Sequence, residues 1–233
     1  MRIDLPVLEG KFLRRYKRFF TDVELPDGSV VVAHCPNTGS LKTCLEEGRP
    51  AILRDTQDPE RKLRHVFQSI RVGKTWVNVD TSLPNQATYE HVVAGQIPEL
   101  KGYAEAKREV KYGVNSRIDL LLTGAKGERC WVEVKNTTYA LDGAAAFPDA
   151  VTERGRKHLE ELAAQVRLGD RAVQFFFVSR DDVARFRPAQ EIDPAYAAAL
   201  RIAAKAGVEL LAYAHSVTPS SLEVARRLPI DLD

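Results

Sequence analysis

The chain has 233 residues, of which 44% are hydrophobic and 28% charged, and its formal net charge is +2. This length allows one large or two small domains with a soluble, globular composition. No run approaches the roughly 18 apolar residues of a membrane helix, and the segment Met1–Pro6 lacks an apolar signal core, so we expect a cytoplasmic protein. Three cysteines, at positions 35, 44 and 130, are too few and too scattered for a disulfide framework or a zinc site.

The first eighty residues predict short strands separated by turns. Residues 19–25 alternate between apolar and polar, Pro26-Asp27-Gly28 supplies turn chemistry, and residues 30–32 return as a strand. About five strands with one short helix fit a small β-barrel such as an OB-fold, although an SH3-like barrel would give nearly the same pattern. The remaining expected elements are a helix over 41–45 and strands over 51–53, 66–72 and 75–79.

From Thr81 onward strands and helices alternate, which predicts an α/β layered domain. We therefore expect an N-terminal domain over 1–81 and a C-terminal domain over 82–233. Ser82–Asn85 is interpreted as a linker. Asp149 is a candidate cap for a long helix that ends at Gly169 and has an apolar stripe from Val151 to Val166. The other expected elements are helices over 89–94 and 195–206, strands over 116–122, 130–135, 172–178 and 208–213, and a hint of helix over 220–228.

Two of these strands place acidic residues close together. The turn between residues 116–122 and 130–135 is centred on Lys126, and a hairpin with that centre sets Asp119 opposite Glu133. Directly opposed side chains share one face, with Cβ atoms roughly 5 Å apart. Because strand side chains alternate between faces, Lys135 joins the same patch while Cys130, Val132 and Val134 point into the core.

Two carboxylates this close repel each other unless a cation lies between them. Mg²⁺ binds through one or two carboxylates and keeps several waters, and Mn²⁺ is a comparable hard cation. Such an ion would polarise a phosphate and activate a bound water, while Lys135 could orient that water. The pattern therefore predicts a Mg²⁺ or Mn²⁺ site for phosphodiester hydrolysis at Asp119 and Glu133. A surface ladder of ion pairs would use the same residue types.

Basic residues elsewhere are candidates for nucleic-acid contacts. Arg154, Lys157 and His158 share one face of the long helix with Glu161 and could hold a phosphate beside the metal, or could form an ordinary solvated face. Near the N-terminus, aromatic and basic residues mix, as in a groove that binds a nucleic-acid strand, although the phenylalanines could equally be core. The basic candidates in that segment are Arg14, Arg15, Lys17 and Arg18.

The order Asp119…Glu133-Val134-Lys135 resembles the D…ExK core of the PD-(D/E)XK nuclease superfamily. Five motifs in order more closely resemble the sugar fermentation stimulation protein family. They are His34-Cys35-Pro36-Asn37-Thr38-Gly39, Glu109-Val110-Lys111-Tyr112-Gly113, Ser116-Arg117-Ile118-Asp119, Val132-Glu133-Val134-Lys135-Asn136, and Phe147-Pro148-Asp149-Ala150-Val151-Thr152-Glu153-Arg154-Gly155.

The resemblance implies an N-terminal OB-fold, a C-terminal PD-(D/E)XK nuclease-like domain, DNA binding and a regulatory link to maltose and other sugar use. It makes Asp119 and Glu133 the metal carboxylates and Lys135 the catalytic lysine. It also implies an acid on the first helix, for which Glu90 is the candidate and Glu109 the alternative. Asn37 and Arg117, which lie within the motifs, are further candidates for nucleic-acid contact. The pair at positions 114–115 departs from the family pattern and could shift the strand register.

The sequence therefore favours a two-domain DNA-binding protein with a Mg²⁺- or Mn²⁺-dependent nuclease site. The alternative is a non-catalytic DNA-binding transcriptional regulator that keeps only the nuclease fold. The strand type, DNA versus RNA and the oligomeric state stay open. A sugar-metabolising enzyme would follow only from the family's name.

Overall fold

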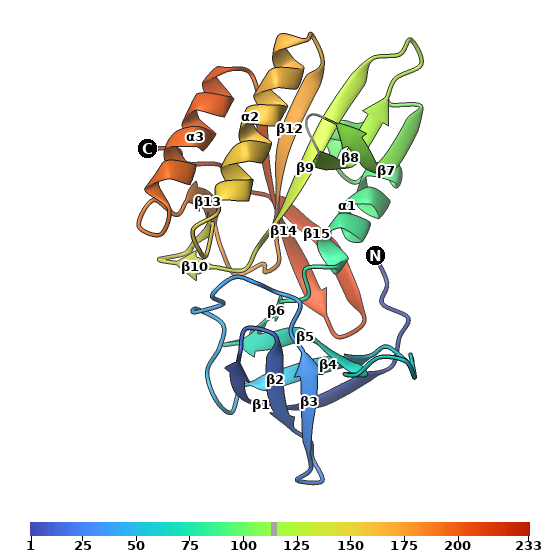
Figure 1. Ribbon diagram of the computed structural model, residues 1–233, viewed down its shortest axis with the longest axis vertical. Coiled ribbons are helices and arrows are strands. Elements are labelled where there is room, and N and C mark those ends of the chain that lie inside the picture. The colour runs from blue at the N-terminus through green and yellow to red at the C-terminus, as the bar shows by residue number, and fades with distance from the viewer. Residues whose placement is uncertain (113–115) are drawn as a thin grey trace.

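The computed structural model describes residues 1–112 and 116–233, and it consists of two domains stacked along the long axis (Figure 1). The departure from the family pattern at positions 114–115 lies outside the described residues. Within the described parts of the chain, no helix has the length and apolar character needed to cross a bilayer.

The N-terminal domain is a six-stranded β-barrel. Its strands follow the order β3-β2-β1-β4-β5-β6, and a parallel pairing of His34 with Val66 joins β3 to β5 and closes the barrel. At Gly10 a Cβ would overlap the Glu24 carbonyl, so β1 passes β2 closely only because it carries a glycine there. The strands are β1 (Val7–Tyr16), β2 (Phe20–Glu24), β3 (Val30–His34), β4 (Pro50–Asp55), β5 (His65–Val72) and β6 (Thr75–Asn78).

The helix predicted over 41–45 is wrong. Leu41 has a left-handed φ of 52°, and the segment forms one turn in which the amides of Cys44 and Leu45 donate to the Leu41 carbonyl. Leu41 and Cys44 are buried in the barrel core with Phe67. The helix-like spacing thus arises because a single turn buries two of its side chains.

The C-terminal domain is built on a six-stranded mixed sheet, in the order β15-β14-β12-β9-β8-β7, with a small sheet β10-β11-β13 beside it. β12 pairs in parallel with β9 and β14, and the outer pairs are antiparallel. The elements are α1 (Leu83–Val93), a 3₁₀ turn η1 (Pro98–Leu100), β7 (Glu105–Tyr112), β8 (Ser116–Thr123), β9 (Arg129–Thr137), β10 (Ala140–Leu141), β11 (Ala144–Phe147), α2 (Glu153–Arg167), β12 (Arg171–Val178), β13 (Arg185–Pro188), α3 (Pro194–Lys205), β14 (Glu209–Thr218) and β15 (Ser221–Arg227).

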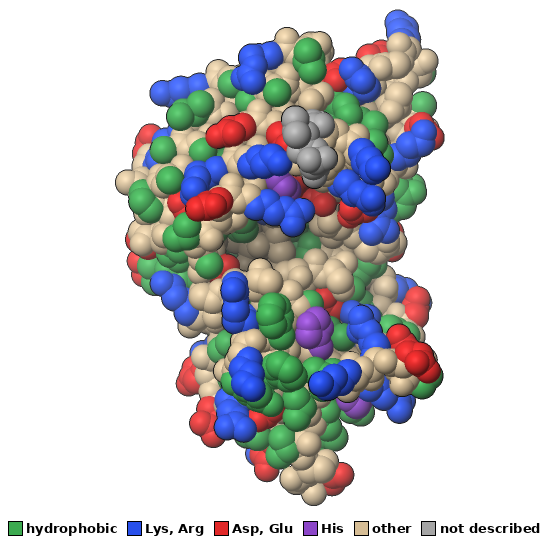
Figure 2. Space-filling model, viewed as in Figure 1, with side chains coloured by type: hydrophobic (Ala, Val, Ile, Leu, Met, Phe, Trp, Pro, Cys, Tyr) green, Lys and Arg blue, Asp and Glu red, His purple; other side chains and the backbone are tan. Residues whose placement is uncertain are grey.

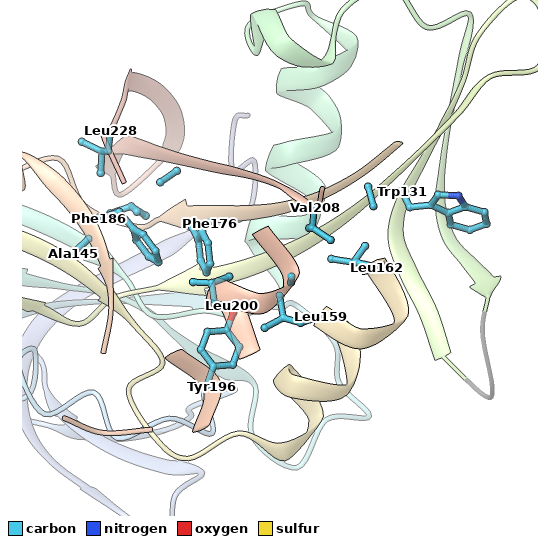
Figure 3. Close-up of a cluster of buried hydrophobic side chains, with 14 of the residues drawn as sticks. Trp131, Ala145, Leu159, Leu162, Phe176, Phe186, Tyr196, Leu200, Val208 and Leu228 are labelled. Carbon is cyan, nitrogen blue, oxygen red and sulfur yellow. The ribbon is translucent and has the colours of Figure 1, made fainter. Parts of the chain in front are cut away.

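Both faces of this sheet are covered by helices. α2 and α3 pack on one face around Phe176, Tyr196 and Leu200 (Figure 3), and α1 packs on the other face near Phe175 and Phe177. Successive residues of β12 therefore enter opposite cores. A strand buried on both sides needs no polar face, which explains why residues 172–178 of β12 are apolar except for the buried Gln174.

Three local predictions in this domain are wrong. Thr152, not Asp149, caps α2 by accepting the Gly155 amide at 3.0 Å, so Val151 precedes the helix and is 68% exposed. Residues 220–228, which hinted at a helix, contain strand β15. The segment interpreted as a linker contains the start of α1, because Pro84 occupies its first turn, where a missing amide hydrogen costs nothing.

Hydrogen bonds along the boundary hold the two domains together. The Asn78 amide donates to the Ser179 carbonyl at 3.1 Å, and Gln68 donates through its side chain to the Pro219 carbonyl at 2.9 Å. In a third contact, the Leu41 amide donates to Asp149 Oδ2 at 3.0 Å. These contacts set the width of the space between the domains.

Candidate functional site

A cleft of about 460 Å³ lies between the two domains and is lined by both. Figure 2 shows the surface hollowed at this boundary, with Lys and Arg side chains gathered around the hollow. The barrel contributes residues 36–39 and Arg18, and the α/β domain contributes the start of α1, the strands β8 and β9, the segment 147–152 and the first turns of α2. Asp119, Glu133, Lys135, Arg154 and His158 are all among the lining residues.

The predicted hairpin register holds. β8 and β9 pair Leu120 with Val132 and Leu122 with Cys130, which are equidistant from Lys126. Asp119 and Glu133 come next in this register, beyond the last regular pair. A single turn with the right centre therefore brings the two carboxylates to neighbouring positions.

β8 is irregular at Asp119. Ile118 packs in the core beneath α2 and α3, whereas Leu120 packs in the core beneath α1, although residues two apart on a strand normally share a face. On the paired strand, Glu109 has a left-handed φ of 54°. The regular alternation on which the prediction relied is therefore broken beside the site.

The Asp119 carboxylate is fixed by two donors. Asn85, in the first turn of α1, donates to Oδ1 at 2.6 Å, and the Val134 amide donates to Oδ2 at 2.7 Å. Burial, and then the charge of Glu133, raise the pKa of Asp119 to about 7 against the favourable effect of Lys135. Asp119 therefore exchanges its proton near neutral pH.

Glu133 is almost completely buried, with 2% of its surface exposed. Burial disfavours its charge, but the Lys135 ammonium and hydrogen bonds from His158 and Lys135 outweigh burial, so the pKa of Glu133 lies below its usual value. Lys135 Nζ lies 2.6 Å from Glu133 Oε1, which His158 Nδ1 also contacts. Glu133 Oε2 is buried and has no hydrogen-bond partner.

His158 links this pair to the helix. Its Nε2 accepts from Arg154 Nε at 3.3 Å, and its Nδ1 contacts Glu133 Oε1 and lies 3.2 Å from Lys135 Nζ. His158 is buried while Arg154 is exposed in the cleft. Lys157, the third predicted residue of this face, lies 3.7 Å from Glu161 and does not line the cleft.

The donor set fits a hard divalent cation. Within the described residues there is no cluster of three or more His, Cys, Asp or Glu side chains suited to a metal, but two carboxylates suffice for Mg²⁺, which fills its other positions with water and phosphate. The buried, unpartnered Glu133 Oε2 is an available ligand atom, and a cation would favour the ionised form of Asp119.

The structure does not bring the predicted first-helix acid to this site. Glu90 accepts from Gln86 on the surface of α1 and does not line the cleft, because Asn85 faces Asp119 and five helical residues rotate Glu90 away. Glu109 is exposed on β7, and its charge contributes to the raised pKa of Asp119. Arg117 is exposed on β8, outside the cleft lining.

The basic residues of the barrel separate into two groups. Arg15 donates from all three guanidinium nitrogens to backbone carbonyls of residues 18, 37 and 39, and Arg14 pairs with Asp22 at 2.8 Å. Neither residue lines the cleft, and the side chain of Arg14 is 73% exposed. Arg18 lines the cleft and donates to the Thr38 carbonyl at 2.9 Å, whereas Lys17 is exposed outside it. Asn37 lines the cleft, and its Oδ1 accepts the Gly39 amide at 2.8 Å.

Two residues of the cleft were missed by sequence reasoning. Asn85 was hidden in a presumed linker, although Pro84 is a helix-start signal that could have revealed it. Asp149 was given the role of a cap, but it bridges the domains by accepting the Leu41 amide. A Cβ at Gly39 would overlap the Asp149 carboxylate, so this close approach requires glycine.

Comparisons with known proteins agree with this architecture. A family model described as the SfsA N-terminal OB domain matches residues 13–79, and one described as the sugar fermentation stimulation protein RE domain matches residues 82–221. The sugar fermentation stimulation protein homolog of Geobacter sulfurreducens is 48% identical over 230 residues, covering 99% of this chain and 98% of that protein. The homolog of Maricaulis maris is 48% identical over 233 residues, covering 100% and 99%.

A solved structure has the same fold. That of Pyrococcus furiosus SfsA in complex with Ca²⁺ superposes with a TM-score of 0.89 at 28% identity, covering 99% of this chain and 98% of that one. The predicted fold class, an OB barrel followed by an α/β nuclease-like domain, is confirmed. The chain belongs to the sugar fermentation stimulation protein family.

Proposed function

We propose that this protein binds DNA in the interdomain cleft and hydrolyses a phosphodiester there with Mg²⁺ or Mn²⁺. The observation that carries the proposal is the pair of adjacent carboxylates, Asp119 and Glu133, with Lys135 2.6 Å from one of them. The proposal keeps the predicted division into a barrel over 1–81 and an α/β domain over 82–233.

Asp119 and the free Oε2 of Glu133 are the groups that would hold the cation. A divalent cation bound there would polarise the scissile phosphate and lower the pKa of a bound water. In the absence of the cation, Lys135 forms an ion pair with Glu133, and His158 contacts the same oxygen. Among the described residues that line the cleft, Lys135 is the one lysine, and its charge would stabilise the oxygens that become more negative during hydrolysis.

The surroundings of the site suit a polyanion. Arg18 on the barrel and Arg154 on α2 line the same cleft. In the part of the chain that the structure describes, neither guanidinium forms an ion pair with a carboxylate, so both can contact phosphates. The relative from Pyrococcus furiosus has been solved with Ca²⁺, a hard cation with the same preference for oxygen ligands, which supports the metal part of the proposal.

The second candidate is a DNA-binding regulator without nuclease activity, linked to sugar use as the family's name suggests. One observation favours it. Lys135 and His158 already contact Oε1 of Glu133, so this oxygen has partners without a cation. In that case the cleft would serve as a docking surface for DNA.

A cleavage assay separates the two candidates. Purified protein is incubated with labelled DNA and Mn²⁺ or Mg²⁺, and binding is measured in EDTA. We expect cleavage that is lost in Asp119→Asn while binding is retained. The matched control is Asp142→Asn, because Asp142 is an exposed aspartate outside the cleft. Intact DNA with every divalent cation, together with retained binding, would instead establish the regulator.

A further inference from the structure

We infer that the cleft accepts a single unpaired nucleic-acid strand, with the sugar-phosphate backbone between Arg18 and Arg154 and the bases against an apolar patch at Val151. This inference rests on the proposed function and specifies its substrate class. It follows from three properties of the cleft: its size, the placement of its cations and its apolar lining.

The cleft has the size of a small-ligand pocket. Its volume of about 460 Å³ lies within the range of roughly 300–1,000 Å³ typical of small-molecule sites. The space can hold one or two nucleotides, but not the stacked pairs of a duplex. Glu133, at 2% exposure, lies at its base, so a scissile phosphate has to enter the cleft to reach the carboxylates.

The width of the cleft is set by bonded contacts. Asp149 accepts the Leu41 amide at 3.0 Å across the domain boundary, and the Thr38 carbonyl accepts from Arg18 at 2.9 Å. Arg15 holds the same loop through the carbonyls of residues 37 and 39. Of these bonds, the one between Leu41 and Asp149 joins the two domains, and the others hold the barrel loop in shape. Widening the cleft for a duplex would break the bond to Asp149, whereas a single strand requires no widening.

Each domain contributes an arginine to the lining of the cleft. Arg18 projects from the turn between β1 and β2, and Arg154 projects from the first turn of α2. Guanidinium groups on opposite walls can neutralise one backbone from both sides. A duplex docked on the surface would meet these walls only at their rims.

Part of the cleft lining is apolar, and the phosphates of a bound strand would not cover it. Val151 is 68% exposed although it lines the cleft, and Pro36 and Pro148 line it as well. The exposed side chain of Val151 therefore offers an apolar surface to a ligand in an otherwise polar cleft. The flat faces of unpaired bases supply such a surface, while a duplex hides them in its stack.

The test compares one labelled DNA oligonucleotide as a single strand, as a blunt duplex with its complement, and as RNA of the same sequence. Binding is measured by fluorescence anisotropy in EDTA, and cleavage is measured with Mn²⁺. We expect the single strand to bind about tenfold tighter than the duplex, the equivalent of one base contact. The RNA arm distinguishes the two sources of an unpaired strand, and tight binding of either one supports the inference.

Two variants locate the strand. Val151→Ser should weaken single-strand binding about threefold and leave any duplex binding unchanged. The control is Val93→Ser, at a similarly exposed valine on α1 outside the cleft, which should have no effect.

The second variant tests the phosphate contact. Arg18→Ala should reduce the slope of log K against log salt by about 0.7, the value for one phosphate contact on a single strand. Arg71→Ala, at an exposed arginine of the same barrel, should leave the slope unchanged.

The outcomes separate this inference from the proposed function. Equal binding and cleavage of duplex and single strand would overturn the inference and leave the nuclease intact. Tight single-strand binding without cleavage under any cation would support the inference while refuting hydrolysis. Absence of binding to every oligonucleotide would refute both.

Discussion

The two walls of the cleft are built in different ways. The α/β wall consists of side chains placed by strand pairing, with Asp119 and Glu133 set by a hairpin whose centre is visible in the sequence, although β8 is irregular at Asp119. The barrel wall is a loop over residues 36–39 whose shape depends on Arg15 and Asp149, and Asp149 belongs to the other domain. The first wall supplies chemistry, and the second sets the width of the cleft.

This difference explains what could be predicted. The α/β domain and its acidic pair follow from local information, since a turn centred on Lys126 and two alternating strands are contiguous in sequence. The bond from the Leu41 amide to Asp149 joins residues 108 positions apart, and no local pattern encodes it. Arg15 and Arg18 are similar in sequence context and both bond the loop over residues 36–39, yet only Arg18 lines the cleft.

The largest effect is expected on the α/β wall, which carries Asp119, Glu133 and Lys135. Lys135→Met removes the amine beside Glu133 while keeping the side-chain length, and we expect hydrolysis to fall at least about 100-fold, the usual loss for a group that stabilises transition-state charge. The measurement is the single-turnover cleavage rate with Mn²⁺. Lys126→Met, in the exposed turn of the same hairpin, is the control and should cleave normally. A rate within threefold of wild type would show that Lys135 serves only to neutralise Glu133.

A second prediction concerns the contact that sets the width. Gly39→Ala places a methyl group against the Asp149 carboxylate, and we expect the free energy of unfolding to fall by about 2 kcal/mol, as for other overpacked sites. Urea unfolding measures this loss. Asp149→Ala alone loses the bond to the Leu41 amide. In the double variant the new methyl group at position 39 no longer meets a carboxylate, so the double variant should be less destabilised than the sum of the two single variants. Strict additivity would mean that the two residues do not meet in solution.

A third prediction uses the raised pKa of Asp119, which is about 7 in the folded protein and close to 3.9 in an unfolded chain. Between these values the folded state holds the proton more tightly, so ionising Asp119 destabilises the fold as the pH rises from about 4 to about 7. We expect the loss of stability between pH 5 and pH 8, measured without divalent cations, to be smaller in Asp119→Asn by on the order of 2 kcal/mol. Adding Mn²⁺ should stabilise wild type more at pH 8 than at pH 6, because the cation competes with the proton. An equal effect at both pH values would place the cation elsewhere.

The smallest effect is expected on the barrel wall, where Arg15 and Lys17 are close in sequence but differ in their contacts. Arg15 donates to three backbone carbonyls that would otherwise lack this partner, and Arg15→Ala should lower the free energy of unfolding by about 1 kcal/mol. Lys17 is exposed in the adjacent turn, so Lys17→Ala should change it by less than about 0.5 kcal/mol. Arg15 shapes the loop beside Arg18, so Arg15→Ala should also weaken single-strand binding. The slope of log K against log salt should fall by less than the amount expected for one phosphate contact. A slope that fell as much as in Arg18→Ala would instead make Arg15 a direct phosphate ligand, and the loop would owe its shape to Asp149 alone.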